Sequence, residues 1–172
     1  VFSAAVNGAS VIVTDMAGNQ LAGPVTSNVS GTFKLPIPKT RLSDDLVFVA
    51  TGGSFIDEAT GTSTANVALK AVISASSLAE DGSVPLSLSP ESTLIYELVD
   101  QHSLSLSQAH ERFESAFAYT FNPHVLPVDA TMMDSDASDE QRLAGLRAAI
   151  FSQLTKDLGL LSSKQFELLD VL

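Results

Sequence analysis

The sequence contains no cysteine, and lysine and arginine together account for only 9 of its 172 residues. The absence of cysteine excludes disulfide bonds, thiolate nucleophiles, zinc clusters built on thiolates and covalent haem attachment. With 20 acidic residues, the shortage of basic ones leaves a formal net charge of −11. Nucleic acids and anionic membranes are bound through basic surfaces that neutralise phosphates, so this charge argues against both as partners.

Long apolar runs and targeting signals are also missing. No apolar run approaches the ~18 residues that a membrane-spanning helix needs, and no stretch resembles a signal peptide. The chain begins at Val1 and not at a methionine, as expected of a processed product or an excerpt of a longer chain. Either origin leaves room for a removed export signal. We therefore predict an exported protein, extracellular or at the cell surface, without membrane insertion.

What the chain does contain changes character at residue 90. Eight of the ten glycines lie before it, among short runs rich in β-branched residues, whereas later apolar residues recur at helical spacing. Strands followed by helices indicate an α+β protein. The sequence predicts a β-domain over residues 1–89 and a helical domain over residues 90–172, with antiparallel helices packed on the β-domain.

Within the first part, we expect strands at residues 9–14, 32–37, 46–50, 65–74 and 84–88. The run 46–50 is almost wholly apolar, which is typical of a central strand buried on both faces. Residues 15–19 carry the glycine and asparagine that tight turns favour, so a hairpin should follow the first of these strands. Residues 54–64 are predicted to form a loop or a wide hairpin.

Within the second part, three helix starts each combine a capping serine with suitable neighbours. They are Ser89 before Pro90 and Glu91, Ser105 with Gln108, and Ser138 with Gln141. We expect the third helix to end at Gly159 and a fourth to run from about residue 163 to the end. The stripe of the third helix should face a core; it consists of Leu143, Leu146, Ile150, Leu154 and Leu158.

Four short motifs in residues 1–75 resemble, in their order, the carboxypeptidase-regulatory-like or prealbumin-like β-sandwich of bacterial surface proteins. They are NGASVIV at 7–13, SGTFKL at 30–35, VFVATGG at 47–53 and DEATG at 57–61. The resemblance implies an immunoglobulin-like sandwich without catalytic residues, used as a spacer, adhesion or assembly module. Residues 84–160 look like the helical segment that often follows such a sandwich in exported proteins and lipoproteins. The first strand, at residues 1–6, is shorter than in the family.

The acidic run 134–140 is the strongest candidate for a metal site. Asp134, Asp136 and Asp139 place oxygens at alternate positions, as a Ca²⁺ loop does. The run lacks the glycine at loop position six and the carboxylate at position twelve. We therefore interpret it as an acidic helix start capped by Ser138, and we predict no metal and no cofactor.

Catalytic patterns are missing as well. The sequence has no Gly-x-Ser-x-Gly elbow, no Ser-x-x-Lys pair and no glycine-rich phosphate loop. His102, His110 and His124 are interpreted as surface residues, because a zinc site would require all three to converge. We therefore predict that the protein is not an enzyme and has no catalytic residues.

These observations favour a non-catalytic extracellular structural or interaction protein that works by protein–protein contact. Such contact includes adhesion and self-association into a surface filament. An open sheet edge can accept a strand from a neighbour. Val1, Phe2, Ala4 and Val6 are the predicted interface of such a donated strand. The alternative is a surface or periplasmic module that binds a glycan or small ligand between the sandwich and the helices.

Overall fold

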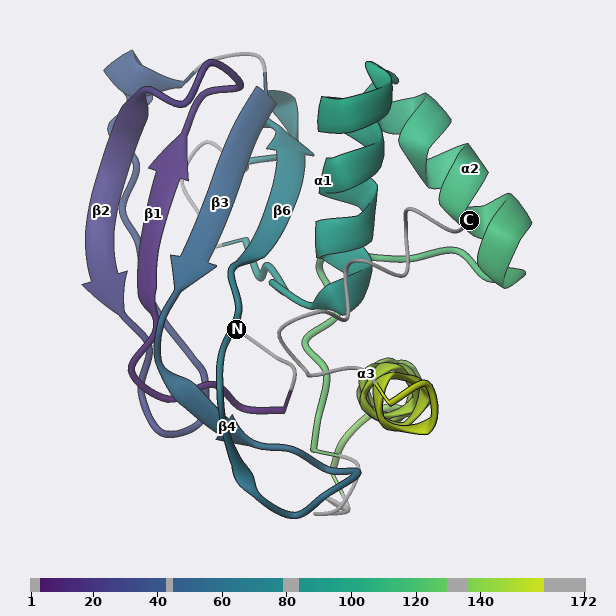
Figure 1. Cartoon of the computed structure of the whole chain (residues 1–172). Helices are drawn as coiled ribbons and strands as arrows, with labels where there is room; N and C mark the ends of the chain where they lie inside the picture. The colour runs from purple at the N-terminus through teal and green to yellow at the C-terminus, as the bar shows by residue number, and fades with distance from the viewer. Residues whose placement is uncertain (1–3, 43–44, 79–83, 130–135, 160–172) are drawn as a thin grey trace.

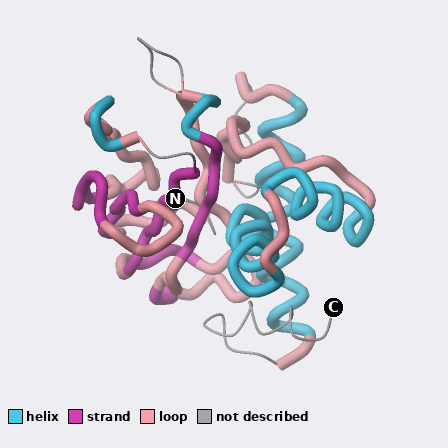
Figure 2. Tube along the Cα trace, turned by 90° about the horizontal axis from the view of Figure 1, so that it is seen from above, coloured by secondary structure: helices cyan, strands magenta, loops and turns pink. Residues whose placement is uncertain are grey.

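The computed structural model describes residues 4–42, 45–78, 84–129 and 136–159. The chain is of mixed type, with strands first and α-helices after them, as the sequence predicted. The described residues form a four-stranded antiparallel sheet, a separate two-stranded hairpin and three α-helices. The helices lie together on one side of the sheet (Figure 1, Figure 2).

The four-stranded sheet has the order β2-β1-β3-β6. Its strands are β1 (Ser10–Thr14), β2 (Gln20–Thr26), β3 (Asp45–Thr51) and β6 (Leu69–Ser74). The predicted hairpin after the first strand is confirmed, since β1 pairs antiparallel with β2 across a turn in which Gly18 has a φ of 84°. The central position of the apolar run is also confirmed, because β3 pairs with β1 on one side and with β6 on the other.

The second sheet is the wide hairpin expected at residues 54–64. It pairs β4 (Ser54–Ile56) with β5 (Ser63–Ala65) in antiparallel register. Asp57 closes the connecting turn, because its side chain accepts hydrogen bonds from the backbone amides of Ala59 and Thr60.

Two strand predictions are wrong. Residues 32–37 are not part of a strand; Pro36 removes an amide donor there, and the alternation of Phe33, Leu35 and Ile37 reflects partial burial against the core. Residues 84–88 are also irregular, and the Ser87 amide donates to the Pro123 carbonyl (2.7 Å) and not to a strand. The strand predicted at 65–74 is shorter, because β6 begins at Leu69.

Both faces of the sheet are buried, because alternate residues of its strands enter two different cores. One core contains Leu46, Phe48 and Ala50 of β3, covered by Phe55 of the hairpin and by the irregular residues 33–37. The other contains Val47 of β3 and Val72 of β6, covered by the helices. The sheet therefore lies between a helical layer and a layer of hairpin and irregular chain.

The three helices begin where the capping signals placed them. They are α1 (Pro90–His102), α2 (Leu106–Phe117) and α3 (Asp139–Asp157), and each has a capping box at its start. The predicted C-terminal stop is confirmed too, since Gly159 follows α3 with a φ of 67°. The predicted fourth helix lies outside the described residues.

Helix α1 attaches the helical part to the sheet along β6 (Figure 1). The Thr93 hydroxyl accepts a hydrogen bond from the backbone amide of Lys70 (2.9 Å), and the Ser92 hydroxyl donates one to the Lys70 carbonyl (2.6 Å). Lys70 also forms a salt bridge with Glu97 of α1 (3.3 Å). At Lys70, therefore, the outer edge of β6 is engaged by side chains of α1.

The buried face of α3 is opposite to the one predicted. The aliphatic stripe Leu143, Leu146, Ile150, Leu154 and Leu158 is between 43% and 56% exposed. Small residues are buried in its place: Gly145, Ala148, Ser152 and Thr155. The reason is close backbone contact, since a Cβ at Gly145 would overlap the carbonyl of Val128. The helix therefore packs through its small-residue face.

Within the described part of the chain, no helix combines the length and apolar character needed to cross a membrane.

Candidate functional site

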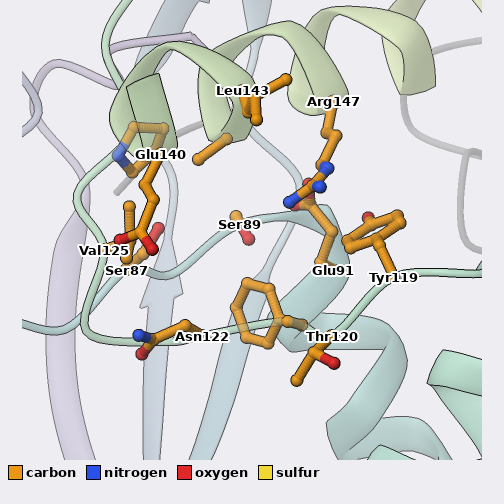
Figure 3. Close-up of a pocket in the computed structure, with 13 residues that line it drawn as sticks. Ser87, Ser89, Glu91, Tyr119, Thr120, Asn122, Val125, Glu140, Leu143 and Arg147 are labelled. Atoms are coloured by element: carbon orange, nitrogen blue, oxygen red, sulfur yellow. The ribbon is translucent and has the colours of Figure 1, made fainter. Parts of the chain in front are cut away.

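A cavity of about 260 Å³ lies where the start of α1 meets α3. Its walls come from residues 87–91, from the irregular segment 119–127 and from one side of α3 (Figure 3). The lining combines hydroxyl groups, the carboxylates of Glu91 and Glu140 and the guanidinium of Arg147 with apolar side chains. Because these segments are far apart in the sequence, the cavity is a product of the tertiary fold.

Glu91 is the buried charge of this cavity. Ser89 caps α1 and Pro90 is the first residue of the helix, so Glu91 lies in the first turn. Only 3% of the Glu91 surface is exposed. Burial raises the pKa of the Glu91 carboxyl above its ordinary value, while hydrogen bonds from its own amide and the Ser89 hydroxyl, and the charge of Arg147, act in the opposite direction. In Figure 3, Glu91 and Arg147 point toward one another.

Tyr119 is placed by the turn that follows α2. Ala118 ends that helix in the left-handed region (φ 58°), and the Tyr119 ring then packs edge-on against Phe113 (5.3 Å between centroids). The Arg147 guanidinium lies over the same ring, 3.8 Å from its centroid. Burial, with the charge of Glu91 adding to it, raises the pKa of the Tyr119 hydroxyl, so this group stays protonated.

Two hydroxyl groups of the lining have no hydrogen-bond partner among the described residues. They are Ser87 Oγ and Tyr119 Oη, and both atoms are buried. Buried polar atoms are nearly always hydrogen-bonded, to protein or to ordered water, because an unpaired one is costly. Both oxygens have almost no accessible surface, so they belong to the packed wall and do not open onto the cavity.

A second feature, the exposed stripe of α3, borders the cavity. We call Leu143, Leu146, Ile150, Leu154 and Leu158 the aliphatic ridge. Its residues follow one another at intervals of three or four, so they form one continuous face of the helix. Leu143 belongs both to the ridge and to the cavity wall. Large contiguous apolar surface of this kind marks interaction sites on soluble proteins.

The predicted strand-exchange residues lie partly outside the described chain. Val1 and Phe2 are outside it, whereas Ala4 and Val6 are buried in the core of the same chain. The Val6 carbonyl accepts a hydrogen bond from the Ser27 hydroxyl (2.7 Å), and Asn7 forms a bridge with Ser54. Donation of this segment to a neighbour would therefore require its withdrawal from its own core.

The acidic run is a helix start where it is described. The Ser138 side chain accepts the Gln141 amide as the N-cap of α3, which confirms the predicted cap. Asp139 is the first helical residue and pairs with Arg142 (3.5 Å), while Asp134 lies outside the described residues. In the described part of the chain, no three His, Asp or Glu side chains group as metal ligands.

The histidines occupy three different settings. His110 is half-buried and stacks on Phe121, and burial lowers its pKa. His124 Nδ1 lies 2.8 Å from the Pro85 carbonyl, and His102 is in the last turn of α1. His102 is exposed, whereas His110 and His124 are each half-buried, and His110 packs in the aromatic group beside the cavity.

Sequence reasoning missed the residues that define the cavity, namely Glu91, Tyr119 and Arg147. Glu91 was expected to complement the dipole at the start of α1, which it does from a buried position. Neither Tyr119 nor Arg147 belongs to a recognisable motif. A buried carboxylate of this kind has no signature in the sequence.

No protein-family model, no curated protein and no solved structure matches this chain.

Proposed function

We propose that the chain is a non-catalytic interaction protein that associates with a second copy of itself through the aliphatic ridge of α3. The observation that carries this proposal is the exposure of five large aliphatic side chains in a single stripe. Burying such a stripe against a similar surface gains roughly 25 cal/mol per Å² of apolar area removed from water. Isolated exposed leucines need no explanation, but a continuous row along a whole helix does.

A second copy of the chain is the partner that fits the ridge. The ridge residues are spaced almost equally before and after Ile150, so the ridge is nearly symmetric about that residue. If two α3 helices pack antiparallel about a two-fold axis at Ile150, Leu146 of one copy lies opposite Leu154 of the other. Leu143 and Leu158, which lie seven residues before and eight residues after Ile150, are then close to one another across the contact. Two-fold contacts of this kind are the commonest in homo-oligomers, since one self-complementary surface serves both subunits.

The charges beside the ridge agree with this arrangement. Arg142 lies beside the ridge near the start of α3, and Asp157 lies within the arc of the ridge near the end of the helix. In an antiparallel pair, Arg142 of one copy lies across from Asp157 of the other, and the two-fold axis produces this contact twice. Complementary charges at a rim fix register and orientation more than they add affinity.

The strand-exchange hypothesis is a competing form of the same function. Both outer strands of the sheet carry features that hinder strand addition: Pro24 in β2 has no amide to donate, and Lys70 of β6 is engaged by α1. The ridge needs no rearrangement of the subunit. The ridge is therefore the better candidate for self-association.

The wider setting remains part of the proposal. The resemblance of residues 1–75 to prealbumin-like sandwiches supports an immunoglobulin-like module at the cell surface. The burial of the sheet on the face opposite the helices agrees with such a module.

Sedimentation velocity over a range of concentrations tests the proposal. The unaltered chain should form a concentration-dependent dimer, and Ile150→Glu should make it monomeric, since a charge would be buried in the interface. Ile56→Glu is a matched control, because Ile56 on β4 is 58% exposed and Ile150 is 56% exposed. The control variant should dimerise like the unaltered chain.

A charge exchange tests the antiparallel arrangement itself. Arg142→Asp and Asp157→Arg should each weaken the dimer, and the double variant should restore it. A dimer unaffected by these changes and by Ile150→Glu would contradict the proposal. A monomer at every concentration that dimerises only after removal of residues 160–172 would show that the chain covers its own ridge, and this result too would overturn it.

A further inference from the structure

The turn that follows β2 carries an inference that does not depend on self-association. Asn28, Val29 and Ser30 form an Asn-x-Ser sequence, which is the acceptor pattern of N-linked glycosylation. No other asparagine of the chain has a serine or threonine two residues later. We propose that Asn28 is a glycosylation site, at which the side-chain nitrogen Nδ2 receives an oligosaccharide. The site rests on the proposed export of the chain, because acceptors of this kind lie on the surface of secreted proteins.

The acceptor sequence lies on the surface of the folded chain. Asn28, Val29 and Ser30 are all exposed, and Val29 exposes 76% of its surface although it is apolar. The turn comes directly after β2, which is the outer strand on the side of the sheet away from β6 and α1 (Figure 1). An enzyme therefore has access to these three residues without displacing the sheet or the helices.

Hydrogen bonds hold the Asn28 side chain in place and leave its nitrogen available. The side-chain oxygen Oδ1 accepts the backbone amides of Ser30 and Thr32, each at 3.0 Å. The Asn28 amide donates to the Thr32 carbonyl (3.0 Å), which closes the turn. Nδ2 forms no hydrogen bond with any of the described residues. Because Oδ1 and Nδ2 lie on opposite sides of the same carboxamide carbon, Nδ2 is directed away from the amides that hold Oδ1.

The second substrate of the transfer is an activated oligosaccharide, of the class linked to a polyprenyl diphosphate. Asn28 Nδ2 forms a bond to C1 of the first sugar, and the bond between C1 and the diphosphate oxygen breaks. The polyprenyl diphosphate leaves with the bonding electrons, and one proton of Nδ2 passes to a base of the transferring enzyme. The product keeps Oδ1 as an acceptor, so the hydrogen bonds from Ser30 and Thr32 are retained.

Two substitutions provide matched variants. Ser30→Ala removes the hydroxyl that the acceptor pattern requires, but it keeps the backbone amide that donates to Asn28 Oδ1, so the turn should be preserved. Ala68→Ser creates a second Asn-x-Ser sequence, at Asn66. Asn66 is only 8% exposed, and its Nδ2 donates to the Gly52 carbonyl (3.1 Å). The two asparagines then share the sequence pattern and differ in the accessibility of Nδ2.

Transfer to the folded, unmodified full chain in vitro tests the proposal, so the outcome does not depend on export. The reagents are a purified oligosaccharyltransferase of Asn-x-Ser/Thr specificity, shown to be active on a standard acceptor peptide, and a polyprenyl-diphosphate-linked oligosaccharide. Peptide mass spectra should locate the transferred oligosaccharide on Asn28. Ser30→Ala should lose this transfer, and Ala68→Ser should show it at Asn28 and not at Asn66. Circular dichroism confirms that each variant is folded.

Two results would overturn the proposal. The first is that the active enzyme transfers no oligosaccharide to the folded chain, which would mean that the turn does not present Asn28 as an acceptor. The second is equal transfer to Asn28 and Asn66 in Ala68→Ser, which would mean that the enzyme acts on an unfolded form of the chain. Sedimentation velocity of the same samples reports the proposed self-association separately, so the failure of one proposal is distinguishable from the failure of the other.

Discussion

The carbonyl of Val128 occupies the space that a side chain at Gly145 would need. This contact lets the irregular segment before α3 lie directly against the helix backbone, where the Val128 amide donates to the Gln141 carbonyl (3.3 Å). The Gln141 side chain bonds the Leu126 carbonyl in the same region. The small-residue face of α3 is thereby held inward, and the aliphatic ridge is left outside.

Gly145→Ala should therefore destabilise the protein. Helix propensity alone predicts that the change stabilises by about 1 kcal/mol, because alanine is the better helix former. The clash with Val128 should reverse the sign, with a loss of roughly 1–3 kcal/mol that is typical of overpacking. The free energies of unfolding of Gly145→Ala and the unaltered protein, measured in urea, decide between these two expectations. A gain in the free energy of unfolding would show that this face of α3 is open.

Leu154→Ala should have little effect on the stability of the subunit. Leu154 is 43% exposed, so its truncation leaves no cavity and should change the free energy of unfolding by less than about 1 kcal/mol. Leu69→Ala is the comparison, since Leu69 is fully buried in the sheet core and should lose about 2–5 kcal/mol. Both are measured in urea at low protein concentration, where the proposed dimer dissociates. A decrease of about 2 kcal/mol or more in the free energy of unfolding of Leu154→Ala would mean that the ridge is packed in a core.

These two variants concern the part of the fold that the sequence predicted least well. Helix starts are local, because a capping serine and its partner three residues later interact within one turn, and all three were located correctly. The central strand was also predictable from its unbroken apolar run. The orientation of α3 depends instead on Gly145 meeting Val128 across a loop, which no local pattern reports. The aliphatic stripe was the stronger signal, and it indicated the wrong face.

The candidate cavity shows the same limit. Glu91 lies two residues after the cap of α1, where an acidic residue is ordinary, and only the approach of α3 turns it into a buried charge. Arg147 carries no motif, and its position over Tyr119 depends on the turn after α2. The irregular course of residues 84–88 was equally hidden, since the partner of the Ser87 amide is Pro123 in the helical part.

Thr93→Val should weaken the attachment of α1 to the sheet. The Thr93 hydroxyl is buried and accepts the Lys70 amide (2.9 Å), so its removal leaves an amide without that partner at the edge of β6. We expect a loss of about 1–3 kcal/mol in the free energy of unfolding, the usual penalty for a buried unpaired donor. Thr93→Ser keeps the hydroxyl, so its free energy of unfolding should decrease by less. A loss of stability in Thr93→Ser but not in Thr93→Val would instead assign the role of Thr93 to packing of its methyl group.

The stability of the protein should fall with rising pH because of Glu91. Burial raises the pKa of Glu91 in the folded state above its ordinary value of 4.5, so the folded state binds more protons than the unfolded state between these two values. The stabilising contribution is complete below pH 4.5 and is lost as the pH rises through the raised folded pKa. Glu91→Gln cannot titrate, so its free energy of unfolding relative to the unaltered protein should increase with pH across this interval. Urea unfolding of both proteins at several pH values measures that difference. A Glu91→Gln protein that instead becomes relatively less stable as the pH rises would mean that the charge of Arg147 and the hydrogen bonds to the carboxylate outweigh the cost of its burial.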